Sequence, residues 1–257
     1  MNNLVKLHTT NRIAYIEINH PPANALNRSV LEALLQAVER VKADPNVKVA
    51  VITGTGKLFV AGADIKEMAG KTTSDEGTEL ARLGQEVFNR IESAAKPFIA
   101  AINGACFGGG LEMAMACHLR YAAVGAKLGQ PEINLGLIPG FGGTQRLPRL
   151  IGQPAALEML LTGKAITAEQ AYANGLINRV VPDEELLPEV TMIAEQIAKK
   201  GSMAIKKILG AVHLGNELPL SERLQFEAKS FGRVFGSEAK REGVAAFLEK
   251  REPQFRD

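Results

Sequence analysis

Two isolated glutamates are the residues of this sequence best suited to proton transfer. Glu112 is the only charged residue of segment 97–117, and Glu132 is the only one of segment 128–145. A lone glutamate is more often a surface residue, because a carboxylate is rarely buried without a partner. The apolar and glycine-rich surroundings of these two favour a pocket instead. Burial raises a carboxyl pKa toward neutrality, so the pair could supply one general acid and one general base.

Glycines beside Glu112 offer a second chemical element. Gly108, Gly109 and Gly110 precede it, and a helix that begins at or just after Gly109 leaves free backbone amides that a substrate oxygen can approach closely. The alternative is a tight turn or close helix packing. Segment 59–64, FVAGAD, is another loop of small residues whose amide could converge on the same point. Two amides and two carboxylates together suit the stabilisation of an enolate during proton transfer.

Other common sites do not fit the sequence. Gly70-Lys71-Thr72 ends like a phosphate-binding loop, but Ile65 stands where that loop needs its first glycine. Neither a GxSxG nor an HExxH motif occurs, and the four histidines lack the spacing of metal ligands. Cys106 and Cys117 lie among apolar residues, which disfavours a disulfide framework and a cysteine-based zinc site. The sequence therefore predicts chemistry without a metal ion or a redox cofactor.

The amino-terminal part of the chain alternates predicted strands and helices. Segment Arg12–Asn19 predicts a strand with Ala14, Ile16 and Ile18 on one face and the odd-numbered residues on the other. Further buried strands are predicted at 47–53 and 97–102.

Between the first two strands, a helix is predicted to begin at a capping box. Ser29 is the predicted N-cap and Glu32 the N3 residue, ahead of an apolar stripe that ends near Asp44.

Helices are predicted for the carboxyl-terminal part. Apolar residues recur at helical spacing from Pro154 onward, and one helix is expected over Ser237–Arg251. The prediction is an α/β core over residues 1–190, which carries the site, followed by an all-helical region over residues 191–257.

Composition excludes several classes of protein. The chain has 257 residues, of which 46% are hydrophobic and 23% charged, with a net charge of +2. This composition excludes a disordered chain, and the small charge disfavours a dedicated nucleic-acid binder. The uncharged stretch 97–111 is too short to span a membrane. The amino-terminal segment has no apolar signal region, so a cytoplasmic location is expected.

The chain resembles the crotonase (enoyl-CoA hydratase/isomerase) family, and specifically its enoyl-CoA hydratases. The resemblance covers nearly the whole chain and rests on five motifs: AGADIKEM at 61–68, AINGA at 101–105 followed by GGGLE at 108–112, GQPE at 129–132, GLIPG at 136–140 followed by GTQRL at 143–147, and AFLEKR at 246–251. It implies a spiral of ββα units with a helical trimerisation region. Trimers of this family commonly pair into hexamers, and the substrate is a CoA thioester, so CoA enters as part of the substrate rather than as a cofactor.

The same resemblance assigns residue roles. It implies that the amides of Ala63 and Gly109 form an oxyanion hole for the thioester oxygen. Glu112 and Glu132 match the two catalytic glutamates, which hold one water, remove its proton and supply a proton to the substrate. Which glutamate does which stays open. Segments that enclose CoA are matched by Ala25, Leu26, Ala61, Asp64, Ile65 and Lys66, and Lys250 takes the place of a basic residue near the CoA phosphates, in its own subunit or a neighbouring one.

Alternatives remain at this stage. Both glutamates are present, which favours hydration of a trans-2-enoyl-CoA in fatty acid β-oxidation over isomerisation. A hydratase or dehydratase of a branched or substituted acyl-CoA, of the methylglutaconyl-CoA or crotonobetainyl-CoA type, has the same two acids. An RNA-binding protein is the alternative outside enzymes, because Lys199, Lys200, Lys206 and Lys207 cluster in one helical region. A solvated helix face explains that cluster better, given the nearly neutral chain.

Overall fold

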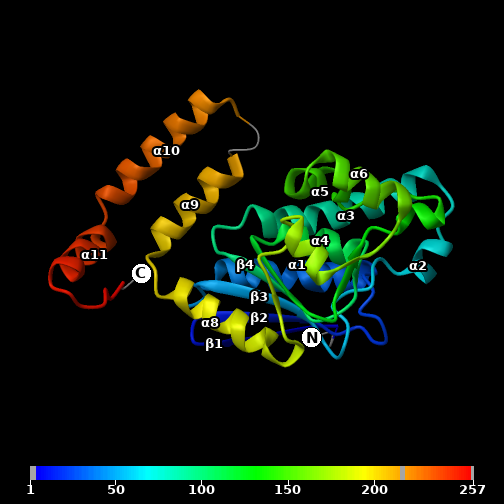
Figure 1. Ribbon diagram of the computed structural model, residues 1–257, viewed down its shortest axis with the longest axis horizontal. Helices are drawn as coiled ribbons and strands as arrows, with labels where there is room; N and C mark the ends of the chain where they lie inside the picture. The colour runs from blue at the N-terminus through cyan, green and yellow to red at the C-terminus, as the bar shows by residue number, and fades with distance from the viewer. Residues whose placement is uncertain (1–3, 215–217, 256–257) are drawn as a thin grey trace.

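A six-stranded sheet forms the centre of the molecule (Figure 1). The computed structural model describes residues 4–214 and 218–255, and within them the sheet has the order β1-β2-β3-β4-β6-β9. β1 and β2 form an antiparallel hairpin, and each later pair is parallel. The strands are β1 Val5–Thr10, β2 Ile13–Ile18, β3 Val49–Gly54, β4 Phe98–Ile102, β6 Leu119–Ala123 and β9 Arg179–Val181. The three strands predicted from the sequence are confirmed within two residues at each end.

A second, smaller sheet carries the loops around the candidate site. It consists of β5 (Cys106–Phe107), β7 (Lys127–Gly129) and β8 (Ile166–Thr167), in the order β5-β7-β8. β5 pairs with β7 in parallel, so the residues that follow these two strands emerge at the same edge. This pairing brings the glycines after β5 next to the segment that contains Glu132.

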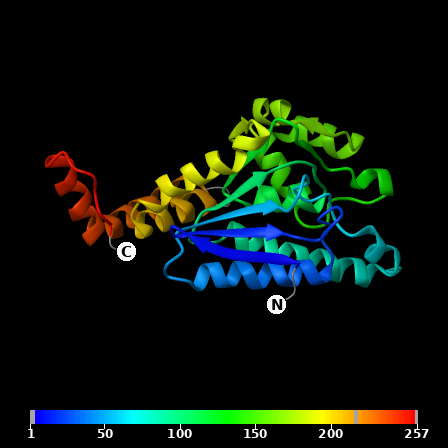
Figure 2. The ribbon, with the colours of Figure 1, turned by 90° about the horizontal axis from the view of Figure 1, so that it is seen from below.

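Helices cover both faces of the main sheet. α1 (Arg28–Ala43) and α3 (Ser74–Glu92) pack on one face, with Ala14, Ile16 and Ile18 beneath them. The opposite face, which includes Ile13, packs against α8 (Leu186–Ala198). Figure 2 shows α1 running along one side of the strands. The predicted alternation of β2 is therefore confirmed, because the side chains of successive residues pack into two separate hydrophobic cores.

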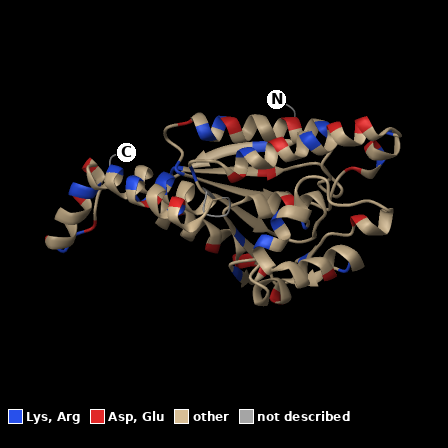
Figure 3. Cartoon of the chain, turned by 90° about the horizontal axis from the view of Figure 1, so that it is seen from above, with Lys and Arg blue, Asp and Glu red and all other residues tan. Residues whose placement is uncertain are grey.

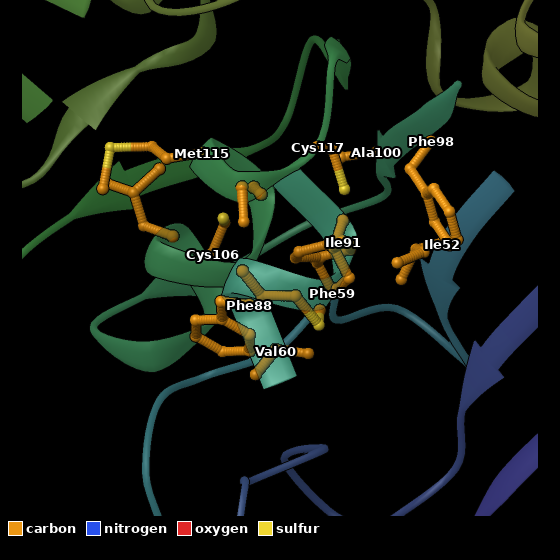
Figure 4. Close-up of a cluster of buried hydrophobic side chains, with 14 of the residues drawn as sticks. Ile52, Phe59, Val60, Phe88, Ile91, Phe98, Ala100, Cys106, Met115 and Cys117 are labelled. Atoms are coloured by element: carbon orange, nitrogen blue, oxygen red, sulfur yellow. The ribbon is translucent and has the colours of Figure 1, made fainter. Parts of the chain in front are cut away.

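The larger core is filled by aromatic, aliphatic and cysteine side chains (Figure 4). Phe59, Phe88 and Phe98 are fully buried, as is Cys106. Cys117 is also buried, and both cysteines are free thiols whose pKa burial raises. They behave as small apolar side chains within this core.

Helix α1 begins two residues earlier than the sequence analysis predicts. Asn27 is the N-cap, and its side chain accepts a hydrogen bond of 2.9 Å from the Val30 N–H. The predicted capping box of Ser29 and Glu32 is wrong, because Asn27, which caps a helix as well as serine does, takes the N-cap position. The helix ends at Ala43, directly before Asp44, as predicted.

Ten further helices complete the described part of the chain. They are α2 Ile65–Ala69, α4 Gly109–Ala116, the 3₁₀ helix η1 Glu132–Leu135, α5 Gly143–Ile151, α6 Gln153–Thr162, α7 Ala168–Ala173, the 3₁₀ helix η2 Asp183–Glu185, α9 Ser202–Leu214, α10 Leu220–Phe235 and α11 Glu238–Leu248. The helix predicted over Ser237–Arg251 is confirmed as α11, with Ser237 as its N-cap. Nowhere in residues 4–214 and 218–255 is a helix both long and apolar enough to cross a bilayer.

The carboxyl-terminal helices extend away from the body of the molecule. Figures 1 and 2 both show α10 and α11 at the end opposite α2. The predicted boundary at residue 190 falls within helix α8, which packs on the main sheet. The division of the chain into two regions at that residue stays a prediction. Figure 3 shows that positively and negatively charged residues are interspersed along the helices, which does not favour a nucleic-acid surface.

Candidate active site

The loop at residues 60–64 lies between two other segments of the chain. On one side, the Leu26 N–H donates to the Gly62 carbonyl at 2.8 Å, and the Asp64 N–H donates to the Leu26 carbonyl at 2.9 Å. On the other side, the Phe107 N–H donates to the Val60 carbonyl at 3.0 Å. These bonds place the small-residue loop beside the start of α4.

Two backbone amides at this junction are free to bind a substrate oxygen. Gly109 is the first residue of α4, so its N–H has no acceptor within the helix. Among the described residues, neither the Ala63 N–H nor the Gly109 N–H donates to a protein acceptor outside regular helix and strand pairing. The sequence prediction that a helix begins at Gly109 is confirmed.

Glu112 is a buried carboxyl group held by the backbone of a distant loop. It lies on the first turn of α4, and only 1% of its surface is exposed. Its Oε1 accepts hydrogen bonds from the Phe141 N–H at 2.8 Å and the Gly143 N–H at 2.7 Å. Because both bonds go to Oε1, Oε2 is left for another partner. The predicted burial of Glu112 is confirmed.

Glu132 approaches the same junction from the other side. It is the first residue of η1, three residues after β7. A Cβ placed on Gly108 would lie 2.9 Å from Glu132 Oε1, so a larger residue would displace this carboxylate from its position. Gly108 also has a φ of +49°, a conformation that glycine adopts readily. The predicted approach of a substrate oxygen to the glycine backbone stays a prediction.

Gln130 contacts Glu132 from the interior. With its amide nitrogen turned toward the carboxylate, Gln130 donates to the two oxygens of Glu132 at 2.9 and 3.0 Å. Its side chain is completely buried. Gln130 belongs to the GQPE motif at 129–132, and the motif alone does not indicate its role.

Burial raises the pKa of both carboxyl groups. Desolvation is the main cause for Glu112, whose pKa rises from 4.5 to about 7, and the nearby Glu132 adds to the rise. The hydrogen bonds from Gly143 and Phe141, together with the charge of Arg146, oppose it. Desolvation also raises the pKa of Glu132. A pair of this kind can hold one proton near neutral pH, and it titrates as a pair.

The raised pKa of Glu112 predicts that Glu112→Gln stabilises the fold at alkaline pH. A carboxyl group whose pKa is higher in the folded state contributes its full stability below the unfolded value of about 4.5. That contribution is lost as the pH rises to about 7, where the folded group ionises. At 1.36 kcal/mol per pKa unit, the loss in the free energy of unfolding reaches about 3 kcal/mol. A glutamine does not ionise, so Glu112→Gln lacks this loss.

Urea unfolding of both proteins at pH 5 and pH 8, at one protein concentration, measures this effect. The free energy of unfolding of Glu112→Gln, minus that of the unsubstituted protein, should be larger at pH 8 than at pH 5. A difference between the two proteins that is the same at both pH values would contradict the raised pKa.

Both glutamates and both free amides line one cavity of about 220 Å³. Its other walls are mostly apolar, from α2, α3, η1 and the loop that follows η1. The lining residues are Ala61, Gly62, Ala63, Ile65, Met68, Gly77, Leu80, Ala81, Gly108, Gly109, Glu112, Pro131, Glu132, Leu135, Leu137, Ile138, Gly140 and Phe141. An apolar pocket with a few convergent polar groups is the usual form of a small-molecule site.

Four of the seven residues predicted to contact CoA belong to segment 61–66, part of which lines this cavity. Ala61 and Ile65 line it. Asp64 caps α2 by accepting from the Lys66 N–H at 2.9 Å, and the Lys66 side chain is exposed. Contacts of these residues with CoA stay predictions.

The remaining predicted CoA residues are placed less directly. Ala25 is half-buried and precedes Leu26, which is 1% exposed and whose backbone holds the loop at residues 60–64. Lys250 follows α11, at the end of the molecule opposite α2 (Figure 1). The structure therefore does not bring Lys250 to the cavity of its own chain.

Residues that the sequence analysis missed hold the glutamates in place. Besides Gln130, the amides of Phe141 and Gly143 contact Glu112, and they come from a loop about thirty residues further along the chain. The signal in the sequence is the run Gly-Phe-Gly-Gly at 140–143, whose glycines indicate an unusual backbone. Gly142 confirms this indication with a φ of +114°. In residues 4–214 and 218–255, no group of three or more His, Cys, Asp or Glu side chains could hold a metal ion.

Comparisons with known proteins agree with this site. The sequence model of the family described as "Enoyl-CoA hydratase/isomerase" matches residues 8–257. A crotonyl-CoA hydratase of Syntrophomonas wolfei is 47% identical over 97% of this chain and 96% of its own length. A short-chain-enoyl-CoA hydratase of Clostridium acetobutylicum is 41% identical over 98% of this chain and 96% of its own. The crystal structure of an enoyl-CoA hydratase from Bacillus anthracis has a TM-score of 0.95, with 37% identity over 98% of this chain and 99% of that one.

The chain belongs to the enoyl-CoA hydratase/isomerase family. The predicted fold is confirmed: it is the α/β crotonase fold with a helical carboxyl-terminal region.

Proposed function

We propose that this protein is an enoyl-CoA hydratase, a hydro-lyase of class EC 4.2.1.17 that adds water reversibly across the C2–C3 double bond of a trans-2-enoyl-CoA. One observation carries the proposal: the buried Glu112, the half-buried Glu132 and the two residues with free amides, Ala63 and Gly109, line the same apolar cavity. Relatives named as hydratases, at 41% and 47% identity over nearly the full chain, support it. The product is a 3-hydroxyacyl-CoA, and the reaction fits fatty acid β-oxidation.

In the proposed mechanism, the amides of Ala63 and Gly109 bind the thioester oxygen. Glu112 and Glu132 hold one water between them. As the water oxygen bonds to C3, one carboxylate takes its proton, and the electron pair of the double bond moves toward the thioester oxygen to give an enolate. The other glutamate, which is protonated, then gives a proton to C2 as the enolate collapses. Amide donors that are already in place stabilise the enolate charge without further rearrangement.

Short acyl chains are the proposed substrate class. The apolar walls of the cavity suit an alkyl chain. The names of the two hydratase relatives, crotonyl-CoA and short-chain-enoyl-CoA, support this preference. The CoA part of the substrate is proposed to be enclosed by Ile65, Lys66 and the turn at Ala25. The proposed location of the protein is the cytoplasm.

The activity is tested with straight-chain trans-2-enoyl-CoA thioesters of increasing length, by following loss of the conjugated thioester absorbance. Hydration that is fastest with the shortest substrates is expected. Branched and substituted enoyl-CoA substrates in the same assay test the second hydratase interpretation. A 3-enoyl-CoA that is converted to the 2-enoyl isomer, without hydration of any 2-enoyl substrate, would assign the chain to isomerisation instead.

The reaction is expected to need no metal ion and no redox cofactor. Amides and carboxylates supply all the groups that the proposed mechanism uses. Incubation with EDTA followed by gel filtration should therefore leave kcat unchanged. A large loss of rate that a divalent cation restores would contradict this expectation.

A homotrimer, or a hexamer built as a dimer of trimers, is the proposed assembly. Large apolar side chains are exposed on α10 and α11, among them Phe231 at 67%, Phe247 at 81% and Leu248 at 74%. Exposed apolar patches of this kind mark protein interfaces. Assembly through these helices would also let Lys250 reach the CoA site of a neighbouring subunit.

Light scattering at assay concentration measures the assembly. The mass should be a multiple of the 27.6 kDa chain that corresponds to three or six copies. A stable monomer would contradict the proposal, and Phe247→Ser is expected to shift the assembly toward smaller species.

A further inference from the structure

The loop that holds Glu112 is itself held from outside the cavity. Glu112 fixes the Phe141 N–H, while the Phe141 carbonyl accepts a hydrogen bond of 2.9 Å from Arg146 Nη1. Arg146 lies one turn into α5, and its backbone N–H donates to the Gly142 carbonyl at 2.9 Å. The same residue therefore contacts the loop through its backbone and its side chain.

Gly142 lets the guanidinium approach the loop this closely. Its φ is +114°, and a Cβ placed there would lie 2.2 Å from Arg146 Nη1. The backbone conformation that turns both the Phe141 and the Gly143 amides toward Glu112 is thus the one that leaves space for Arg146.

Helix α3 fixes the guanidinium in turn. Arg146 donates to Glu92 Oε2 from Nε at 2.9 Å and from Nη2 at 2.7 Å, and to Asn89 Oδ1 at 2.6 Å. The Arg146 side chain is 8% exposed and that of Glu92 28% exposed, so the pair is largely shielded from water. A charged network of this kind holds one geometry when each donor is satisfied.

We infer that Arg146 is a positioning residue that keeps the Phe141 and Gly143 amides on Glu112, through a network anchored at Glu92 and Asn89. This inference rests on the proposed hydratase function for its effect on rate. Arg146 does not line the cavity, so it acts on the reaction through the loop. Without it, the loop loses the bond at the Phe141 carbonyl, and the carboxylate of Glu112 loses its fixed orientation. A displacement of about 1 Å in a reacting group can lower a rate about 100-fold.

Two readouts distinguish positioning from general support of the fold. The first is kcat and KM for hydration by Arg146→Lys, which keeps the charge but cannot reproduce the planar fork of bonds. We expect kcat to fall about 10- to 100-fold with KM nearly unchanged. The double variant Glu112→Gln with Arg146→Lys should have a kcat within twofold of that of Glu112→Gln, because the carboxyl group through which Arg146 acts is already absent.

The second readout needs no substrate. Glu132 and Arg146 are the charged groups that act on Glu112, and the amides of Gly143 and Phe141 are its hydrogen-bond donors. Arg146→Met removes a charge and loosens these donors, all of which oppose the rise of the Glu112 pKa. The pH-dependent loss of stability assigned to Glu112 should therefore extend to higher pH in Arg146→Met than in the unsubstituted protein.

Arg149→Lys is the matched control, because Arg149 is exposed on the same helix. It should match the unsubstituted protein in both readouts. The inference is overturned if Arg146→Lys is folded and has the same kcat as the control. It is also overturned if Arg146→Lys lowers kcat by the same factor in the unsubstituted protein and in Glu112→Gln. If the unsubstituted protein hydrates no enoyl-CoA, the proposed function fails, and an unshifted pH–stability curve in Arg146→Met then overturns the inference independently.

Discussion

Replacement of either Glu112 or Glu132 with glutamine is expected to lower kcat by ~10²–10⁴-fold, the contribution of a positioned general acid or base. Glutamine keeps the shape of the side chain but cannot transfer the proton. In Glu112→Gln, the amide oxygen can still accept from the Phe141 and Gly143 amides, so the fold and substrate binding should persist. Steady-state kinetics with a short trans-2-enoyl-CoA, beside thermal unfolding, measure both properties.

The double substitution separates a shared mechanism from two independent effects. If the two glutamates act on one water, the double variant should lose far less than the product of the single losses, because residues that act as a unit are not additive. Glu158→Gln is the control, since Glu158 is exposed on α6. Near-normal turnover in a folded single variant would remove that glutamate from the mechanism. If Glu132 proved dispensable, isomerisation would become the better assignment.

The two glutamates could be predicted from the sequence because their isolation is a local property. Each is the only charged residue in a long apolar or glycine-rich segment, a pattern that favours a pocket without knowledge of the fold. The start of α4 could also be predicted from a local pattern, the three consecutive glycines Gly108–Gly110. The strands at 49–54 and 98–102 are continuous apolar runs, which parallel strands covered on both faces require.

The partners of the glutamates could not be predicted in the same way. Glu112 is bound by backbone amides of Phe141 and Gly143, and a backbone amide leaves no mark of its own in the residue types. Arg146 resembles any arginine of an amphipathic helix until the tertiary structure places Glu92 and Asn89 around it. Long-range contacts of this kind depend on how α3 packs beside α5, which no local pattern encodes.

The N-cap of α1 shows a different limit. Asn27 and Ser29 are both good caps, and local pattern alone does not rank them. The hydrogen bonds of Leu26 with the loop at residues 60–64 fix the chain directly before Asn27, so the helix begins there. A tertiary contact thus decides between two local alternatives of similar free energy.

Removal of the Gly109 N–H is expected to cost about 10²–10³-fold in kcat, the usual effect of losing one oxyanion-hole donor. Gly109→Pro removes this donor, and proline is tolerated at the first position of a helix. A Cβ at residue 109 would lie 3.1 Å from Phe141 Cδ2 and 3.3 Å from Leu26 Cδ1, so any substitution tightens this contact.

Gly109→Ala is therefore the matched control, because it adds the same Cβ and keeps the N–H. The proline Cδ takes the place of the amide hydrogen, so the difference in kcat between the proline and alanine variants measures the loss of this donor together with the space that Cδ occupies, provided that thermal unfolding shows both to be folded. The loss should appear mainly in kcat, because the charge on the thioester oxygen grows as the enolate forms and the N–H stabilises that charge more than the ground state. Equal kcat values for two folded variants would exclude Gly109 as an oxyanion donor and leave Ala63 to bind the oxygen with another group.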